Sequence, residues 1–235
     1  MDRNVSTLKH IGKASQAARK LILASFILLA ALLAVGLLGK FLGGLILALG
    51  SALIFIWILF VLFTLYFFRD PTANVPSGKN LVVSPAHGTV DVIDETTENE
   101  FIGGRCKRVS IFLNVFNVHV QQAPVSSKVD FLRHTSGLFL NAMRTDSATQ
   151  NENVLIGFIP KDHPAEKIGV RLIAGLIARR IIPWVNVGDE LAAGERISLI
   201  QFGSRADLYL PLDYKIRAKI GDKVIGGETI VAAKD

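Results

Sequence analysis

A glycine-serine pair is the first feature of this chain that could do covalent chemistry. Ser204 follows Gly203 in residues 197–211, ISLIQFGSRADLYLP, where an apolar, strand-like pattern breaks and soon resumes. A serine hydroxyl is a poor nucleophile unless a base lies within hydrogen-bonding reach or the neighbouring carbonyl is strained toward attack. Gly203 has no Cβ, so it permits an unusual backbone and leaves its carbonyl unhindered. The pair meets one requirement of a reactive serine and still needs a base.

His119 is the candidate base, within the segment SIFLNVFNVHVQQAPVSSKV. If residues 111–120 are extended, side chains alternate between two faces. Asn117 and His119 would then point together, and Phe116 and Val118 would point the other way. A histidine in a strand is more commonly a structural group than a catalyst, so His119 alone does not establish a site.

The elements that would position these residues are β-strands. After the Pro-, Gly- and Asn-rich linker at 69–80, short apolar runs alternate with turn residues over 81–235, a pattern that predicts a β-rich domain. A helix over 172–182 is the one competing interpretation. The predicted strands are 81–83, 89–93, 108–116, 118–120, 154–159, 170–178, 197–201, 208–210 and 215–220.

A short internal repeat lies in the second half of this domain. VNVGDELAAGERISLI from Val185 and AKIGDKVIGGETIVA from Ala218 share an apolar-Gly-Asp-x-apolar-x-x-Gly-Glu-x-Ile frame. Its Gly-Asp and Gly-Glu steps suit two tight turns. Together with SPAHGTV at 84–90, the frame resembles the half-units of biotinyl and lipoyl carrier domains. We therefore expect a duplicated barrel-sandwich architecture, which by itself implies no chemistry.

The N-terminal part is strongly apolar. Residues 21–39 and 41–68 contain no charged side chain, and each run is long enough to cross a bilayer. Neither fits the shorter apolar region of a secretory signal peptide. We expect a transmembrane hairpin over 21–68, with helices at 21–39 and 45–67; a single long helix or a re-entrant pair is left open.

The charge distribution orients this hairpin. Residues 1–20 carry five Lys and Arg against one Asp, which predicts a cytoplasmic N-terminus and, after two crossings, a cytoplasmic domain. Tyr66 beside Arg69 fits an interfacial anchor. The net charge of +6 comes from 1–68, with 6 basic and 1 acidic residues, which leaves 20 (26 − 6) against 19 (20 − 1) for the rest. A nearly neutral domain is a poor partner for nucleic acid.

Cysteine and histidine usage argues against a metal site. The single Cys106 excludes an intrachain disulfide and a cysteine-rich metal centre, and it is best explained by packing. HGTVD at 87–91 suggests a lysostaphin-like zinc peptidase, but such a site needs a further His-x-His pair, and His119 stands alone between valines. We expect no metal.

Five segments carry a resemblance to a known family. FFRDP, SPAHGTV, FNVHVQQAPVSSKV, NENVLIGF and VRLIAGLIARRIIPWVNVGDELAAGERISLIQFGSRADLYLP occur in this order. Together they resemble the short form of phosphatidylserine decarboxylase, a family that includes archaetidylserine decarboxylases. The similarity extends from about Phe67 to the C-terminus and is most specific over 173–211.

The resemblance implies that the chain cuts itself. In the family, the serine of the Gly-Ser motif attacks the preceding glycine carbonyl, and the resulting ester eliminates to dehydroalanine, which hydrolyses to a pyruvoyl group. Here scission would fall between Gly203 and Ser204 and give a long chain, 1–203, and a short chain, 204–235. The pyruvoyl group from Ser204 would bind the substrate amine as a Schiff base and accept the electrons released by decarboxylation. No metal or diffusible cofactor is implied.

His119 matches the family's base for self-cleavage, but two neighbouring positions depart from the family pattern. A second histidine, found three residues earlier in longer bacterial relatives, is Phe116 here, so the proton donor to the carbanion is left open between His119 and water. The family Asp that orients the catalytic histidine is replaced by His87, which cannot supply a fixed negative charge. His87 is therefore either a weaker partner of His119 or a turn residue.

Further departures affect substrate recognition. Many members have Asn-Arg at Gln121-Gln122 and Arg at Asn153. Arginine pairs with phosphate through a fork of N–H donors, so its loss would weaken binding of the headgroup. The remaining candidates for substrate binding are Arg179, Arg180, Arg205 and Asn117.

The resemblance thus implies a membrane-anchored, self-processing carboxy-lyase. Its substrate would be phosphatidylserine or archaetidylserine, its product the corresponding ethanolamine lipid, and its location the cytoplasmic side of the inner membrane. Ester or ether linkage and assembly into a homo-oligomer are left open. The alternatives are a membrane-tethered biotinyl-like carrier or adaptor, which would lack the usual modified lysine hairpin, and an inactive decarboxylase relative.

Overall fold

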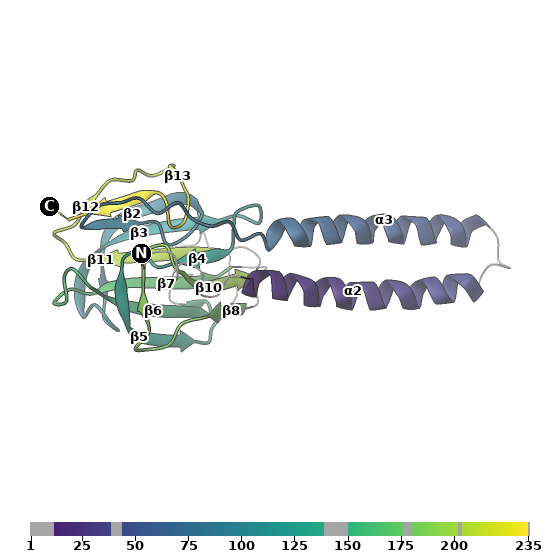
Figure 1. Ribbon diagram of the computed structural model, residues 1–235, viewed down its shortest axis with the longest axis horizontal. Helices are drawn as coiled ribbons and strands as arrows, with labels where there is room; N and C mark the ends of the chain where they lie inside the picture. Colours follow the sequence, from purple (N-terminus) through teal and green to yellow (C-terminus); the bar gives the residue numbers. More distant parts are fainter. Residues whose placement is uncertain (1–11, 39–43, 139–149, 176–179, 202–203, 235) are drawn as a thin grey trace. The chain divides into compact units, whose positions relative to one another are not determined.

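The computed structural model describes residues 12–38, 44–138, 150–175, 180–201 and 204–234 (Figure 1). A helical unit, Gly12–Asp70, is distinct from a β-rich unit that includes Pro71–Asp235. Two long apolar helices followed by a mainly β domain were expected from the sequence, and this architecture is confirmed; the structure adds that the β domain is mainly antiparallel. Gly203, Arg179 and most of the predicted helix connector lie outside the described residues.

The helical unit is a pair of antiparallel helices, α2 (Lys13–Leu38) and α3 (Gly44–Phe67). Trp57 Nε1 donates to Ser25 Oγ at 3.0 Å, and the rings of Trp57 and Phe26 lie 6.1 Å apart. These contacts join the two helices, so a single continuous helix is ruled out. Helix α2 begins earlier than predicted and takes in basic residues of the N-terminal segment.

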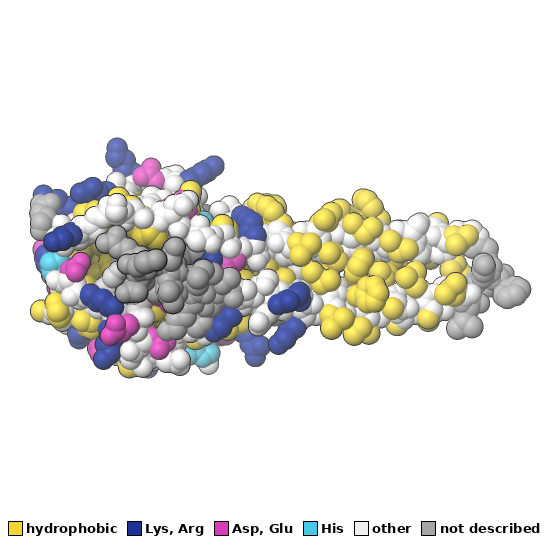
Figure 2. All heavy atoms as spheres, in the orientation of Figure 1, with side chains coloured by type: hydrophobic (Ala, Val, Ile, Leu, Met, Phe, Trp, Pro, Cys, Tyr) yellow, Lys and Arg dark blue, Asp and Glu magenta, His cyan; other side chains and the backbone are white. Residues whose placement is uncertain are grey.

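Both helices are long and apolar enough to span a membrane. Mean hydropathy is 2.5 over Lys13–Leu37 and 2.8 over Ile46–Phe67, and hydrophobic side chains cover their surfaces (Figure 2). Such exposed apolar surface needs an apolar surrounding. At the end of α3, the Arg69 guanidinium lies 4.0 Å from the Tyr66 ring centroid and also donates to the Tyr66 carbonyl. The contact joins the two residues for which an interfacial anchor was predicted, and that role stays a prediction.

The β unit contains one large curled sheet and two small sheets, with all named strand pairs antiparallel. The eight-stranded sheet has the order β13 (Lys223–Val224), β2 (Gly88–Glu98), β3 (Gly104–Leu113), β11 (Ser204–Leu210), β7 (Ile168–Ala174), β6 (Asn153–Pro160), β5 (Ser127–Thr135) and β9 (Glu190–Leu191). The small sheets have the orders β4 (Val120–Gln122), β10 (Arg196–Gln201), β8 (Arg180–Pro183) and β1 (Leu81–Val83), β14 (Ile230–Ala233), β12 (Lys215–Ile216).

The predicted extended segment at 111–120 is wrong. Strand β3 ends at Leu113, and the chain turns before β4 begins at Val120. The turn is closed by Asn117, whose side-chain Oδ1 accepts from Asn114 N at 2.9 Å and whose own N–H donates to the Asn114 carbonyl at 3.0 Å. Asparagine favours such local bonds over a strand ladder. The shared face of Asn117 and His119 therefore does not exist.

Other strand boundaries also differ from the prediction. Strand β5, SKVDFLRHT, was missed because its charged residues obscure the apolar alternation. The predicted strand at 215–220 is limited to β12, since Asp222 Oδ2 accepts from Lys219 N and closes a turn there. The part of 170–178 beyond Gly175 lies outside the described residues.

The internal repeat folds as two matched units. Gly188 and Gly221, at the Gly-Asp steps, have φ of +99° and +92°, and Gly194 and Gly227 have +76° and +75°. Such positive φ values strain any residue with a Cβ. The Gly-Asp turns close in the same way, because Asp189 and Asp222 accept from the backbone N–H three residues earlier at 2.9 and 2.8 Å.

The two units exchange equivalent hydrogen bonds with residues 84–90 and 123–129. Gly227 N donates to Ser84 O and Gly194 N to Ala123 O, both at 2.8 Å. Between the units, Val83 N donates to Pro124 O and Gln122 N to Pro85 O, both at 2.9 Å. The bonds are matched by an offset of 39 in the first segments (123 − 84) and 33 in the repeats (227 − 194). They describe an approximate two-fold relation.

Strand β11 lies at the centre of the large sheet and is buried along its whole length. Its alternate residues Ala206, Leu208 and Leu210 pack into the main hydrophobic core. The intervening residues point to the other face of the sheet, where Tyr209 joins a second cluster with Phe101. The period of two therefore assigns Ser204 to the core face.

Arg205 and Asp207 form a buried ion pair on the outer face of β11. Arg205 Nε and Nη2 donate to Asp207 Oδ1 and Oδ2 at 2.8 and 2.9 Å, and both side chains are almost fully buried. A second forked pair, Arg108 with Asp94, joins β3 to β2 on the same face but is partly exposed. Burial of Asp91 nearby raises the pKa of its carboxyl, although Arg205 opposes the shift.

Gly88 allows β2 to approach β3 closely. A Cβ at this position would overlap the Phe112 carbonyl oxygen and lie 2.9 Å from Ile111 Cγ2. We expect Gly88→Ala to lower the free energy of unfolding by about 1–3 kcal/mol, the typical range for overpacking. Thermal unfolding in detergent would measure this. Gly104→Ala is the control, because a Cβ there meets nothing within 4 Å; equal melting temperatures for the two variants would contradict the packing argument.

The buried ion pair should contribute far more than the exposed one. Asp207→Asn removes the carboxylate that forms the buried fork with Arg205, and we expect a loss of about 3–5 kcal/mol in unfolding free energy. Asp94→Asn removes a pair that is partly exposed to solvent, so about 0–1 kcal/mol is expected. Melting curves of the two variants make the comparison, and a similar shift in both would show that β11 is not held by this pair.

Candidate active site

The Gly-Ser pair lies where the chain leaves one sheet and enters another. Strand β10 ends at Gln201 in a small sheet, and β11 begins at Ser204 in the large sheet. The break in the apolar pattern is therefore a change of sheet between two strands. The strand residues on either side of the pair, Gln201 and Ser204, are both held in ladders, Gln201 by β8 and Ser204 by β3.

The backbone of Ser204 is held by strand pairing on both sides, while its hydroxyl oxygen makes no hydrogen bond to the described residues. The residue is fully buried and pairs with Leu113 on β3 and Ala174 on β7, both members of the main core. Its Oγ has no hydrogen-bond partner among the described residues. Leaving a buried hydroxyl unpaired costs about 1–3 kcal/mol, so this atom needs an explanation, and its place beside Gly203 in the sequence makes a reactive role the one to test.

His119 immediately precedes β4 and is also fully buried. Its Nδ1 lies 2.9 Å from the Asn117 carbonyl oxygen. A carbonyl can only accept, so in the neutral ring Nδ1 carries the proton and Nε2 keeps the lone pair. The ring is thus fixed with Nε2 as its basic nitrogen.

Two further bonds hold the backbone of His119 against β10. The His119 carbonyl accepts from Ile200 N at 3.1 Å and from Gln121 Nε2 at 2.7 Å. Gln121 Oε1 in turn accepts from Ser198 Oγ at 2.7 Å. Since Ile200 is four residues before Ser204, these bonds place His119 beside the strand that leads into the Gly-Ser pair.

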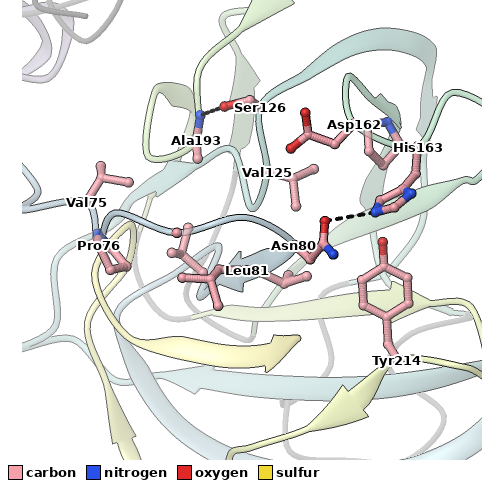
Figure 3. A pocket seen from close by; sticks show the side chains of 14 residues that line it. Val75, Pro76, Asn80, Leu81, Val125, Ser126, Asp162, His163, Ala193 and Tyr214 are labelled. Atoms are coloured by element: carbon pink, nitrogen blue, oxygen red, sulfur yellow. Dashed lines mark hydrogen bonds between the residues drawn. The ribbon is translucent and has the colours of Figure 1, made fainter. Parts of the chain in front are cut away.

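A cavity of about 70 Å³ lies beside the start of β1 (Figure 3). Its two-fold counterpart indicates where His87 lies. Asn80 and Ser126 line the observed cavity, with Asn80 Oδ1 bonded to His163 Nε2 at 3.0 Å and Ser126 Oγ to Ala193 N at 3.1 Å. The two-fold relation matches Asn80 with His119 and Ser126 with His87. It predicts that His119 and His87 face each other across the counterpart of this cavity.

The candidates for substrate binding lie in different surroundings. Arg180 is exposed at the start of β8 and pairs with Gln201, at the end of β10. The Arg205 guanidinium is bonded to Asp207 on the face opposite to Ser204. The Asn117 side chain accepts from Asn114 N and so takes part in the turn. Among the described candidates, Arg180 is the one that is exposed beside the Gly-Ser crossing.

Asn153 and Gln122, where many family members have arginine, are buried in the structure. Asn153 accepts from Arg171 Nη1 at 2.8 Å and donates to the Asn151 carbonyl. Gln122 packs against Gly226, and its Oε1 has no hydrogen-bond partner within the described part of the chain. Over the same residues, no group of three or more His, Cys, Asp or Glu side chains is arranged to hold a metal ion.

Sequence reasoning missed two contributors to the site. The first is the Asn117 main-chain carbonyl, which sets the tautomer of His119, and the second is Gln121, which fixes the His119 backbone. A main-chain acceptor leaves no residue-type signal. Gln121 was recognised only as a departure from the family pattern, because its bonding partner, Ser198, is distant in sequence.

Comparison with known proteins agrees with this geometry. Residues 60–232 match the family model for phosphatidylserine decarboxylase. A phosphatidylserine decarboxylase proenzyme of Desulfotalea psychrophila is 46% identical over 179 residues, which cover 76% of this chain and 83% of the relative. Proenzymes of the same name from Syntrophus aciditrophicus and Symbiobacterium thermophilum are 44% and 41% identical, each with 72% of this chain and 78% of the relative aligned. The chain belongs to the phosphatidylserine decarboxylase family.

Proposed function

We propose that the chain is a self-processing, pyruvoyl-dependent carboxy-lyase that converts phosphatidylserine into phosphatidylethanolamine. The observation that carries the proposal is the buried Ser204 hydroxyl, which has no hydrogen-bond partner among the described residues and lies at the start of β11, after the strand that bonds to the His119 backbone. The family and the names of its members support the same activity. The archaetidyl lipids are the alternative substrate.

Self-cleavage follows from the roles of three residues. His119 Nε2 takes the Ser204 hydroxyl proton as Oγ attacks the Gly203 carbonyl; the C–N bond breaks, and the proton passes to the nitrogen. Removal of the Ser204 α-proton then expels the Gly203 carboxylate and leaves dehydroalanine. One water is consumed and one ammonia released as residue 204 becomes a pyruvoyl group. The products are the chains 1–203 and 204–235.

The structure around Ser204 suits a group built on that residue. The first residue of β11 is enclosed by core side chains, and strand pairing on both sides would hold the new N-terminus in place. When formed, the carbonyl would condense with the headgroup amine and accept the electrons released with carbon dioxide. Enclosure by β3 and β7 would keep bulk water from this residue.

The Asn117 carbonyl accepts a hydrogen bond from His119 Nδ1 and so orients the ring, which is one of the two roles of the carboxylate in the family. An uncharged acceptor, however, stabilises the imidazolium less than a carboxylate would. His87, on the facing wall by the two-fold relation, supplies no fixed negative charge. The orientation of the base is therefore kept while its electrostatic support is reduced, so we expect a scission that is slower but not abolished.

The proposal also includes a binding residue for the lipid phosphate and a location at the membrane. Arg180 lies beside the end of β10 and would pair with the phosphodiester; Arg179 and Arg205 stay as weaker predictions. The helix pair and the basic N-terminus favour the inner membrane, with the β unit on the cytoplasmic side. The matched repeats support the duplicated barrel-sandwich assignment, and a homo-oligomer stays a prediction.

Intact mass of the purified protein tests the scission. The wild-type chain should yield a short chain of 32 residues (235 − 204 + 1), lighter by one ammonia than its unmodified sequence. Ser204→Ala should stay whole. Ser110→Ala is a matched control, because Ser110 is equally buried with an unpartnered Oγ but sits on β3; it should still be cut. A full-length wild-type chain after expression in membranes would contradict the proposal.

A carboxylate at position 87 should accelerate scission. His87→Asp places a negative charge opposite His119, and stabilising the imidazolium by about 1.4 kcal/mol would raise the rate roughly tenfold. Ser126→Asp adds the same charge at the two-fold related position, which lines a cavity together with Asn80, and should leave the rate unchanged. The time course of scission in a cell-free membrane system measures both. Equal rates for His87→Asp and wild type would show that position 87 does not act on His119.

A further inference from the structure

Two large apolar side chains lie exposed at the Ser204 end of the large sheet. Phe116 is 63% exposed at the tip of the turn after β3, and Leu138 is 56% exposed after β5. Neither belongs to the main hydrophobic core. Exposed apolar side chains on either side of a functional site can mark a surface that meets an apolar partner.

The strand register brings both residues to the same end of β11. Ser204 pairs with Leu113, which is three residues before Phe116. On the other side Ser204 pairs with Ala174, whose N–H donates to the Glu152 carbonyl at 2.9 Å, and Glu152 N donates to the Leu138 carbonyl at 2.9 Å. Three strand spacings, roughly 15 Å, therefore separate Leu138 from Ser204.

The surroundings of these residues fit a lipid surface better than a protein partner. Arg180, exposed at the Gln201 end of β10, adds a cation at the same crossing. Aromatic side chains with nearby basic groups are typical of the boundary between headgroups and acyl chains. The chain itself carries two helices apolar enough to span a bilayer, so such a boundary is within reach of the β unit.

We propose that Phe116 and Leu138 form a rim that inserts into the membrane interface at the entrance to the active site. This rests on the proposed function, because the rim would bring the serine headgroup to residue 204 while the acyl chains stay in the bilayer. Phe116 then takes the position of the second histidine of longer relatives with a different role. It contacts lipid, and the proton of the reaction must come from elsewhere.

Val187 provides a matched control. It is 59% exposed on the Gly-Asp turn whose Gly188 N donates to the Val129 carbonyl. Val129 pairs with Phe158, which pairs with Ile168 at the far end of β7. This is the level of Leu210, about 20 Å along the sheet from Ser204. The rim should meet the membrane and Val187 should not.

Lipid contact can be measured by fluorescence quenching on the full chain reconstituted in vesicles. Phe116→Cys and Val187→Cys would carry an environment-sensitive fluorophore, with spin-labelled phosphatidylcholine as the quencher. The native Cys106 is a suitable blank, because it is buried and burial raises the pKa of its thiol. We expect severalfold stronger quenching at position 116 than at 187. Equal quenching at the two positions would overturn the rim.

The same labels in a Ser204→Ala chain separate the rim from catalysis. The quenching difference should persist in this uncleaved variant, so a failure of the proposed activity would not remove it. In the active enzyme, Phe116→Ser should raise KM for vesicle phosphatidylserine about tenfold without changing kcat or the KM of a water-soluble, short-chain phosphatidylserine. Val187→Ser should change neither. A loss of kcat on both substrates would place Phe116 in the reaction itself and contradict the proposal.

Discussion

The pairing of β11 on both sides is the constraint on which the rest of the structure depends. A strand that is to survive the loss of its upstream peptide bond must be held by something other than chain continuity. Register with β3 and β7, alternate side chains in the core, and the buried Arg205–Asp207 pair meet that need. The same pairing fixes Ser204 as the first residue of the strand, so its hydroxyl is positioned by the sheet and not by a flexible loop.

The duplicated frame explains why His119, the proposed base, lies beside the strand that leads to Ser204. Each repeat builds a Gly-Asp turn, a Gly-Glu turn and a strand that lies beside its first-segment partner, β14 with β1 and β10 with β4. In one unit the residue before the partner strand is Asn80, whose φ is +59° and whose side chain bonds His163. In the other it is His119, bonded to the Asn117 carbonyl. The two matched backbones thus carry different side chains at this position. In the unit that carries His119, strand β10 is followed by β11.

Much of this arrangement could be predicted from the sequence, and the exceptions have physical reasons. Two runs without charged residues predicted the helix pair. The repeated glycines predicted paired turns, because glycine is the residue that adopts positive φ without strain. The Gly203-Ser204 break was visible as an interruption of the apolar pattern. The prediction that Asn117 and His119 share one face of a strand was wrong, because Asn117 bonds to the backbone of Asn114 and forms a turn. The alternation of apolar and polar residues contains no signal for such a bond. The bond from Gln121 to the His119 carbonyl, and the burial of Arg205 against Asp207, depend on strand pairing that no local pattern encodes.

We propose that residue 204 becomes a pyruvoyl group, and so a reactive carbonyl, at the start of β11. The most direct test of this proposal is to treat the purified protein with a hydrazide probe and to locate the label by tandem mass spectrometry of the short chain. A single label is expected on the residue derived from Ser204, followed by Arg205 and Ala206 in unmodified form. A short chain that begins with an unlabelled serine, or a label at any other residue, would contradict the proposal.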